Sequence, residues 1–372
     1  MKLTVIQTLP ALNSGGVERG TLEVAAALVA RGHRAIVVSA GGRMLPELID
    51  TGAEHIELDI GRKSPASLLL VGKLMRLLRS CQPNILHARS RLPAWLSYLA
   101  WSRMQLRERP AFVTSVHGPY SVNRYSRIMT SGEHVIAISS FIKNHILENY
   151  PGVDAQKIRV IPRGIDPASF PYGYKADKEW LDKWKQHLPL ADEGVLLTLP
   201  ARVTRWKGQE DFIQLIAGLH EKGIPAHGLI VGAVEPRRES FQKQLEQQVK
   251  KFAMQDHISF LGHRNDVKEI MSVSDIVLSL SREPEAFGRT SLEALSLGKK
   301  VIAYDHGGAS EVLSEMFPAG LVRPLSIKDA IDKVIEFTRQ PPVVPDKQVF
   351  TLERMLADTL EVYQQAASAR SQ

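Results

Sequence analysis

The 372-residue sequence contains very little cysteine, with Cys81 as its single thiol. One thiol excludes a disulfide framework within the chain and a metal site built from several cysteines. No apolar stretch reaches the roughly 18 residues that a membrane-spanning helix needs, and the amino-terminal residues lack the long apolar run of a signal peptide. These absences favour a cytoplasmic protein.

Acidic residues are scarce in one part of the chain. Residues 62–127 carry twelve Lys and Arg but a single acid, Glu108. Residues 1–170 hold 21 basic and 12 acidic residues, whereas residues 171–372 hold 26 and 28, so the formal net charge of +7 comes from the first part. Such a local excess attracts anionic partners, among which nucleic acid, anionic lipid and phosphorylated glycan all qualify.

Short β-branched runs alternate with helical patterns along most of the sequence. In the first half the predicted strands are 3–9, 34–40, 84–88, 112–117, 134–139 and 158–162. In the second half they are 195–201, 227–232, 258–262, 276–281 and 300–305. This alternation predicts an α/β protein with two doubly wound domains, whose parallel sheets bind ligands at the carboxyl ends of their strands. The aperiodic segment 162–179 places the domains at 1–168 and 169–350, followed by a last helix near 351–368.

The stretch EPEAFGRTSLE, residues 283–293, sets two carboxylates eight positions apart. Glu285 lies in the loop after a strand, and Glu293 lies in the first turn of a helix that begins near Thr290 and Ser291. A helix amino terminus offers unpaired N–H groups and a positive dipole end, which suit a phosphate. Capping by Thr290 or Ser291, with an acid favoured by the dipole, would explain the same residues without a ligand.

Two further strand-to-helix turns are predicted on the same edge of this domain. The first, ARVTRWKGQ, supplies Arg202 and Lys207, which would form a diphosphate clamp opposite a helix amino terminus. The second, YDHGGASE, supplies Gly307 and Gly308, which permit close backbone approach. Together the three turns predict an anion-binding site on the second domain.

The first domain carries weaker signals on its corresponding edge. Gly15 and Gly16 of NSGGVER indicate either a phosphate-approach turn or a tight turn between strand and helix, because no complete GxGxxG is present. His117 ends one predicted strand, and His87 and Arg89 lie at the end of another. A single histidine at such a position is more often structural than functional.

Taken together, these motifs resemble those of a known family. EPEAFGRTSLEALSLG followed by KKVIAYDHGGASEVL is similar to the E-x7-E region of retaining GT-B glycosyltransferases of family GT4, and GGVER, VHG, IPRGID and RVTRWKG resemble its other motifs in the same order. The resemblance covers nearly the whole chain and extends to enzymes of bacterial lipopolysaccharide and envelope polysaccharide synthesis. It implies two Rossmann-like domains facing across a cleft, with residues 351–372 crossing back to the first domain.

The resemblance also implies roles for the motif residues. The second domain would bind a UDP- or GDP-linked sugar, with Glu285 on the sugar and Glu293 on the ribose hydroxyls. The catalytic residues would be Arg202, Lys207, Glu285 and His117. The donor-binding residues would be Gly15, Gly16, Arg202, Lys207, Glu285, Phe287, Gly288, Arg289, Thr290, Ser291 and Glu293. The family transfers a hexose-type sugar with retention of configuration, and neither a protein nucleophile, a divalent metal nor a cofactor is expected.

The acceptor is less clearly indicated than the donor. His87, Arg89 and Arg163 are candidates for acceptor contacts, and Arg163 stands where the family more often has Asn. A glycan, a lipid-linked acceptor or a phosphorylated core would suit the basic first domain.

Two basic stretches favour a peripheral position at the inner face of the cytoplasmic membrane. Residues 67–80 predict a helix with Lys73, Arg76 and Arg79 along one side. Residues 92–109 continue the pattern with Trp95, Tyr98, Trp101, Arg103, Arg107 and Arg109. The alternative is that both stretches pack their apolar sides on the sheet and expose solvated cations.

Two other functions compete with glycosyl transfer. A sugar-nucleotide 2-epimerase uses the same pair of Rossmann-like domains, and only the released product distinguishes it from a transferase. A nucleic-acid-binding protein would use the basic surface and lose affinity steeply with salt. It would leave Glu285, Glu293 and the glycine turns unexplained, so we expect no nucleic-acid partner.

Overall fold

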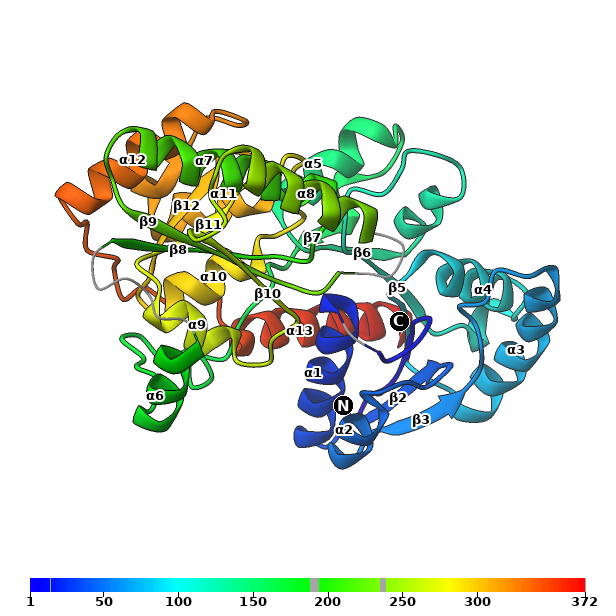
Figure 1. Cartoon of the computed structure of the whole chain (residues 1–372). Coiled ribbons are helices and arrows are strands. Elements are labelled where there is room, and N and C mark those ends of the chain that lie inside the picture. The colour runs from blue at the N-terminus through cyan, green and yellow to red at the C-terminus, as the bar shows by residue number, and fades with distance from the viewer. Residues whose placement is uncertain (14, 188–193, 235–238, 372) are drawn as a thin grey trace. The chain divides into compact units, whose positions relative to one another are not determined.

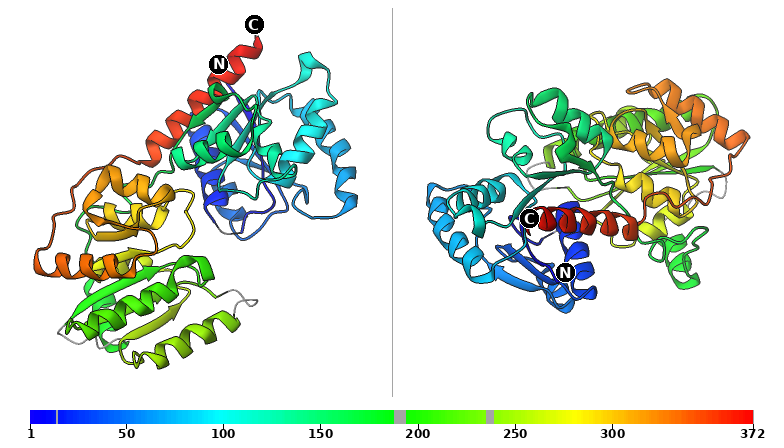
Figure 2. Two further views of the ribbon diagram at one scale, coloured as in Figure 1. Left: turned by 90° about the horizontal axis from the view of Figure 1, so that it is seen from above. Right: turned by 180° about the vertical axis from the view of Figure 1, so that it is seen from behind.

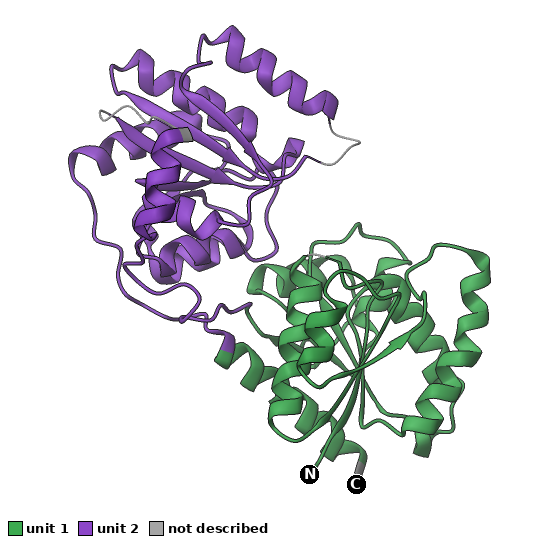
Figure 3. Ribbon diagram, turned by 60° about the horizontal axis from the view of Figure 1, so that its bottom comes forward, with its two compact units in different colours: residues 1–162, 353–372 green, residues 163–352 purple. Residues whose placement is uncertain are grey.

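The computed structural model describes residues 1–13, 15–187, 194–234 and 239–371. These residues form two compact units, unit 1 with residues 1–162 and 353–372, and unit 2 with residues 163–352 (Figure 3). The first division falls six residues before the boundary predicted after residue 168, and the second falls two residues after the one predicted at 350.

Unit 1 is built on a seven-stranded parallel sheet with the order β3-β2-β1-β4-β5-β6-β7 (Figure 1). Its strands are β1 (Thr4–Thr8), β2 (Arg34–Ser39), β3 (Glu54–Glu57), β4 (Ile85–Ala88), β5 (Ala111–Val116), β6 (His134–Ala137) and β7 (Ile158–Val160). Its α-helices are α1 (Gly16–Ala30), α2 (Leu45–Asp50), α3 (Leu70–Cys81), α4 (Arg91–Ser102), α5 (Ser140–Asn149) and, from residue 353 on, α13 (Leu352–Ser371). The strand order reverses between β1 and β4, which is where such sheets bind ligands.

The strands of unit 1 form because their apolar residues are buried on both faces. β5, AFVTSV, is buried at all six positions, as expected of a central parallel strand. Val5 of β1 pairs in register with Ala35 of β2 and with Ile85 of β4. Helices connect the strands and cover the sheet (Figure 2).

Unit 2 repeats this architecture with a six-stranded parallel sheet of order β10-β9-β8-β11-β12-β13. Its strands are β8 (Val195–Pro200), β9 (Ala226–Val231), β10 (Ile258–Gly262), β11 (Ile276–Ser279), β12 (Lys300–Tyr304) and β13 (Leu321–Val322). Its α-helices are α6 (Lys178–His187), α7 (Gln209–Glu221), α8 (Glu239–Lys251), α9 (Val267–Val273), α10 (Arg289–Ser296), α11 (Gly307–Met316) and α12 (Ile327–Arg339). The predicted class, two doubly wound α/β domains, is confirmed.

The carboxyl-terminal helix packs on unit 1, as predicted. The Tyr363 hydroxyl lies 2.6 Å from His87 Nδ1, and Arg370 donates a hydrogen bond of 2.5 Å to Glu133. α13 is therefore part of the core of unit 1, although it follows unit 2 in the chain.

Two predicted helices have different limits in the structure. The helix predicted over 92–109 ends at Ser102, because Arg109 folds back and donates to the carbonyl oxygens of Ser102 and Met104 at 2.7 and 3.0 Å. The polar stretch 237–254 also predicts a helix from its sequence. Of this stretch α8 occupies Glu239–Lys251, and residues 237 and 238 lie outside the described residues.

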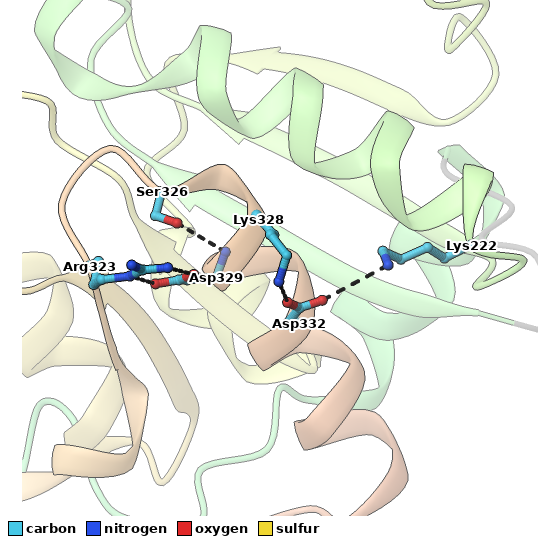
Figure 4. Close-up of polar contacts among 6 residues, drawn as sticks. All are labelled: Lys222, Arg323, Ser326, Lys328, Asp329 and Asp332. Atoms are coloured by element: carbon cyan, nitrogen blue, oxygen red, sulfur yellow. Dashed lines mark hydrogen bonds and ion pairs between the residues drawn. The ribbon is translucent and has the colours of Figure 1, made fainter.

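Charged residues on the surface of unit 2 define the start of α12 (Figure 4). Ser326 is its N-cap and accepts a hydrogen bond from the Asp329 N–H at 3.3 Å. The Arg323 guanidinium holds the pKa of Asp329 well below its usual range. Asp332 accepts from Lys328 at 2.6 Å and lies 4.0 Å from Lys222, which follows α7.

Candidate functional site

The junction between the loop after β11 and α10 is the centre of the candidate site. α10 begins at Arg289, and its N-cap is Gly288 with φ 81°. Thr290 and Ser291 lie in the first turn, so the alternative explanation, in which one of them caps the helix, does not hold. No described side chain caps α10, which leaves its first N–H groups for an anion.

Glu285 forms an ion pair on this loop. Its Oε1 lies 2.7 Å from Lys207 Nζ, and the two side chains are 17% and 16% exposed. The Ser281 hydroxyl donates to the same carboxylate, and the Ser281 carbonyl oxygen lies 2.7 Å from His306 Nε2. The structure therefore brings together two predicted catalytic residues from different strand ends, and His306 supports the loop that holds one of them.

The three basic side chains of the RVTRWKG loop, Arg202, Arg205 and Lys207, have different surroundings. Arg205 lies 4.8 Å from the centre of the Phe241 ring and donates to Gln244 at 2.7 Å, so it is held against α8. Arg202 is exposed directly after β8. Lys207 alone of these three is paired with Glu285.

The Lys207 loop is tied to the Glu285 loop by backbone contacts. The Arg282 N–H donates to the Trp206 carbonyl oxygen at 2.7 Å. Gly208 has φ 78°, and a Cβ there would lie 1.9 Å from the Leu280 carbonyl oxygen, which only glycine avoids. The two charged side chains are thus presented by loops that hold each other in place.

Glu293 is paired with Arg289 within α10. Its Oε1 lies 2.9 Å from Arg289 Nε, one helical turn earlier. Burial raises the pKa of Glu293, and the positive charge of Arg289 opposes that rise. An ionised carboxylate can accept hydrogen bonds from two neighbouring hydroxyls, which is the chemistry a ribose contact requires. The ribose contact itself stays a prediction.

Glycines at the start of α11 let that helix pack directly against the Glu285 loop. The Gly308 N–H donates to the Glu285 carbonyl oxygen at 2.7 Å, and a Cβ on Gly308 would lie 2.3 Å from Phe287 Cα. The close approach expected of Gly308 is therefore present, with this loop as its partner. Phe287 is 5% exposed and packs edge-on against Phe350, so its side chain belongs to the core.

Three buried polar atoms near this edge lack a partner among the described residues, namely Thr204 Oγ1, Gln209 Oε1 and Ser291 Oγ. Ser291 is one of the predicted donor-binding residues, whereas Thr204 and Gln209 were not predicted. These two flank Lys207 in sequence and are 2% and 0% exposed. The sequence analysis named only the charged residues of this turn, although the polar residues around them were also a signal.

The predicted glycines of unit 1 differ in what the fold demands of them. Gly15 is the N-cap of α1 with φ 135°, and a Cβ there would lie 2.7 Å from Glu18 Oε2. Gly16 is exposed, and a Cβ at this position would meet no described atom within 4 Å. Packing within the described residues therefore does not require a glycine at position 16. Its approach to a donor stays a prediction.

The acceptor candidates of unit 1 are deeply buried. His87 is 0% exposed, and its Nδ1 and Nε2 lie 2.6 Å from the Tyr363 hydroxyl and the Ser115 Oγ. Arg89 is 2% exposed and donates to Gln7 Oε1 at 2.7 Å. Both residues therefore take part in the polar interior of unit 1, and contact with an acceptor stays a prediction.

The two remaining candidates are less buried. His117 follows β5 and is half-buried, as is Arg163, the first residue of unit 2. The predicted contact of His117 with the donor sugar and that of Arg163 with the acceptor stay predictions.

No group of three or more His, Cys, Asp or Glu side chains among the described residues could hold a metal ion. Nor do these residues form any helix with the length and apolar character needed to cross a membrane.

The sequence matches two family descriptions and resembles a named relative. Residues 14–169 match Glycosyltransferase Family 4, and residues 182–349 match Glycosyl transferases group 1. The N-acetyl-alpha-D-glucosaminyl L-malate synthase of Bacillus anthracis is 27% identical over 330 residues, which cover 84% of this chain and 81% of the relative.

Solved structures extend the similarity to the full length. A glycosyltransferase from Rickettsia africae is 33% identical with a TM-score of 0.85, and the match covers 98% of each chain. The Anabaena protein HepE, crystallised with UDP and glucose, is 21% identical with a TM-score of 0.79 over 98% of this chain and 100% of its own, which shows a shared fold. The chain therefore belongs to the family 4 glycosyltransferases, enzymes of the GT-B fold.

Proposed function

We propose that this enzyme transfers a hexose-type sugar from a UDP- or GDP-linked donor that binds to unit 2. The observation that carries the proposal is the Lys207–Glu285 pair, which shares one sheet edge with the uncapped amino end of α10. A cation and open N–H groups suit a diphosphate, and a carboxylate suits sugar hydroxyls. The fold shared with HepE, whose crystal held UDP and glucose, supports a nucleotide-sugar donor.

In the proposed reaction the configuration at the anomeric carbon is retained. The acceptor oxygen bonds to that carbon on the face from which the nucleoside diphosphate leaves. The carbon–oxygen bond to the phosphate breaks, and the acceptor proton passes to the departing phosphate oxygen. Arg202, Lys207 and the α10 N–H groups stabilise the developing charge, where one lost donor group costs about 3 kcal/mol in comparable sites. We propose no protein nucleophile, because the acceptor oxygen itself attacks the anomeric carbon. We propose no divalent metal, because these groups already supply the positive charge, and no cofactor, because the transfer involves no change of oxidation state.

We place the acceptor on unit 1 and assign it to lipopolysaccharide or other envelope polysaccharide synthesis, as a glycan, a lipid-linked acceptor or a phosphorylated core. The support is the excess of basic residues, twelve against one acid between residues 62 and 127. An anionic acceptor or an anionic membrane surface would both favour such a field.

The surface of α3 is the part of unit 1 that suits an anionic membrane. Lys73, Arg76 and Arg79 are exposed along this helix, and Leu68 and Leu69 just before it are 62% and 77% exposed. Cations beside exposed leucines are typical of helices that lie in a membrane interface. A cytoplasmic enzyme attached peripherally through α3 is therefore part of the proposal.

The aromatic residues of α4 do not contribute to such a surface. Trp101 donates to the Pro110 carbonyl oxygen at 2.8 Å, lies 5.7 Å from the Phe112 ring and is covered by the Arg109 guanidinium at 4.7 Å. Trp95 donates to the Tyr125 carbonyl oxygen at 2.9 Å. Both indoles are engaged within unit 1, as the packing alternative predicts.

Sedimentation with phosphatidylglycerol vesicles tests the membrane surface. Reversing Arg76, Arg79 and Arg103 to Glu should abolish binding. Reversing three cations of α8 in unit 2, namely Lys243, Lys250 and Lys251, should leave it intact. No binding by the wild type, or equal binding by both variants, would remove this part of the proposal.

Calorimetry with UDP, GDP and ADP tests the donor site. Selective binding of one nucleotide that is weakened in Glu293→Ala supports the proposal, with Glu315→Ala, an exposed acid of α11, as the matched control. Product analysis then separates the candidates. A glycosylated acceptor identifies the transferase, whereas an epimerised sugar nucleotide identifies a 2-epimerase. Failure of all three nucleotides to bind would overturn the donor assignment.

A further inference from the structure

A cavity of about 420 Å³ lies in unit 1 at the amino ends of β4 and β5. Asn84 and Pro110, which directly precede these strands, form part of its wall, together with the ends of α3 and α13 and the segment after α4. This edge of the sheet is opposite to the one at which Arg89 and His117 follow β4 and β5. We call the cavity the amino-edge pocket. Its volume is in the range of sites that hold small molecules.

Positive charge predominates in the wall of the amino-edge pocket. The charged lining residues are Arg79, Arg107, Glu108, Arg109 and Arg370. Glu108 Oε2 lies 3.7 Å from Arg79 Nε, and Arg370 donates to Glu133, an acid outside the wall. Four cations and two acids leave two positive charges without a described acidic partner.

These two charges are those of Arg107 and Arg109. No described carboxylate oxygen lies within 4.0 Å of either guanidinium. Arg107 is exposed in the short turn Leu106–Glu108. Arg109 is half-buried, and its Nε and Nη2 donate only to neutral carbonyl oxygens, while the guanidinium covers the Trp101 ring at 4.7 Å. Such contacts fix the direction of the guanidinium but do not neutralise its charge.

The wall also offers neutral donors. Asn84 Oδ1 accepts from the Thr4 N–H at 2.7 Å, so the amide nitrogen of Asn84 can donate to a ligand. Arg370 Nε is buried and has no hydrogen-bond partner among the described residues. Guanidinium groups with amide donors suit the several oxygens of a phosphate group, because each planar guanidinium can donate two parallel hydrogen bonds.

A structural role accounts for only part of this cluster. Arg370 donates to the Arg109 carbonyl oxygen at 3.0 Å, which ties α13 to the residues that precede β5. That role explains Arg370 and the carbonyl contacts of Arg109. It explains neither the position of Arg107 at the cavity nor the charge that Arg109 retains.

We propose that the amino-edge pocket binds a phosphate monoester or diester, at the sheet edge opposite to the one that carries the predicted acceptor residues. The ligand is a free phosphate ester or the headgroup of a membrane lipid, and Arg79 also belongs to the exposed surface of α3. The proposal does not rest on the proposed function. It gives Arg107 and Arg109 a partner other than the acceptor.

Calorimetry with glycerol 3-phosphate tests the pocket on the full chain, with UDP in excess to occupy the donor site. Arg107→Gln should weaken binding about tenfold, because a charged donor is lost. Arg31→Gln is the matched control, an exposed arginine of unit 1 that does not line the pocket, and it should change affinity less than about twofold.

Glu108→Gln tests the same site with the opposite sign. It removes the acid of the wall, so binding should tighten about threefold, whereas Glu148→Gln, an exposed acid of α5, should leave it unchanged. Arg107 and Glu108 are both exposed, so these variants should fold. A merely structural cluster would show neither the loss nor the gain.

Sedimentation with phosphatidylglycerol vesicles distinguishes the two sources of phosphate. For a free ester, glycerol 3-phosphate binding depends on Arg107 and vesicle binding does not. For a lipid, vesicle binding falls in Arg107→Gln and glycerol 3-phosphate competes with it. The proposal is overturned if the wild type binds neither probe, or if Arg107→Gln binds both as the wild type does. Failure of UDP to bind counts against the proposed donor site alone.

Discussion

The carboxyl edges of the two sheets both include a strand reversal, but their polar side chains differ in exposure. On unit 2, Lys207 and Glu285 are 16% and 17% exposed, and the amino end of α10 is uncapped. On unit 1, His87 and Arg89 are 0% and 2% exposed and bond to Tyr363, Ser115 and Gln7. The same fold therefore presents charge at one edge and buries it at the other. We infer that unit 2 is preorganised for a ligand, whereas polar groups of unit 1 also hold β1, β4, β5 and α13 together.

Removing the presented charge should have the largest effect. Lys207→Ala deletes a cation proposed to stabilise the leaving phosphate and leaves Glu285 without its 2.7 Å partner. We expect the transfer rate to fall by about 100- to 1000-fold, the loss seen when one preorganised donor is removed from comparable sites. Steady-state product formation measures it. Lys222→Ala, on the exposed network of Figure 4, is the control and should leave the rate unchanged.

We expect a smaller effect, a loss of folding stability, when a side chain at Gly308 forces α11 away from the Glu285 loop. A Cβ on Gly308 would lie 2.3 Å from Phe287 Cα, so Gly308→Ala must displace backbone on one side. Overpacking of this kind typically costs about 1–3 kcal/mol in the free energy of unfolding. Urea unfolding measures this loss, and nucleotide binding should weaken with it because the Glu285 loop moves.

Gly16→Ala is the matched variant on unit 1, where a Cβ has open space. Its stability should equal that of the wild type. Reduced donor binding in Gly16→Ala would then reveal a ligand that approaches the backbone closely. Unchanged donor binding would contradict the predicted role of Gly16.

Much of unit 2 follows from its sequence because its signals are local. Arg202, Lys207 and Glu285 lie in short strand-to-helix turns, and Glu293 lies in α10, which follows one of them. The cations, the glycines and the helix start in these turns predict an anion-binding site, whereas the roles of the two acids come from the family resemblance. The sequence analysis did not predict α6, because this helix has few apolar residues from which a helical period could be recognised. Trp180 and Trp184 stack at 4.9 Å in a stretch otherwise rich in charge, and Trp184 is buried against β8 and β9.

The interior of unit 1 could not be predicted in the same way. His87 meets Tyr363 across 276 positions in the sequence, and only the return of α13 brings them together. No local pattern distinguishes a histidine or arginine that will be buried in such a network from one that will reach a ligand. The burial of Arg89 depends on the fold, and the residues around it in the sequence do not indicate it.

The pH dependence of donor binding should sharpen the contrast further. Burial raises the pKa of Glu293 in the folded protein above the unfolded value of about 4.3. Below its folded pKa the protonated acid accepts hydrogen bonds poorly, so UDP-glucose affinity should fall by up to about tenfold per pH unit as the pH drops. UDP-glucose suits this titration because its diphosphate keeps a constant charge.

The Arg289→Met variant and the pH dependence of folding stability both report on the protonation of Glu293. Arg289→Met removes the charge that opposes the rise, so the loss of affinity should begin at a higher pH. Folding stability should depend on pH in the opposite direction to donor affinity. The raised pKa of Glu293 means that the folded protein favours the protonated acid. That stability is present below about pH 4.3 and is lost as the pH rises through the folded pKa. A flat affinity profile in the wild type would contradict the role of Glu293 at the ribose.

The smallest effect should come from an ion pair that no ligand needs. Asp332 meets Lys328 at 2.6 Å, a distance close to the 2.7 Å between Glu285 and Lys207, but its side chain is 44% exposed. Asp332→Asn should therefore change the free energy of unfolding by about 1 kcal/mol or less, diminishing with salt, and leave transfer unchanged. Urea unfolding at low and high salt measures it. Because the two pairs are nearly equal in length, a large effect at Asp332 would mean that distance governs their strength. A small one would mean that burial and the position at the sheet edge separate a functional pair from a surface pair.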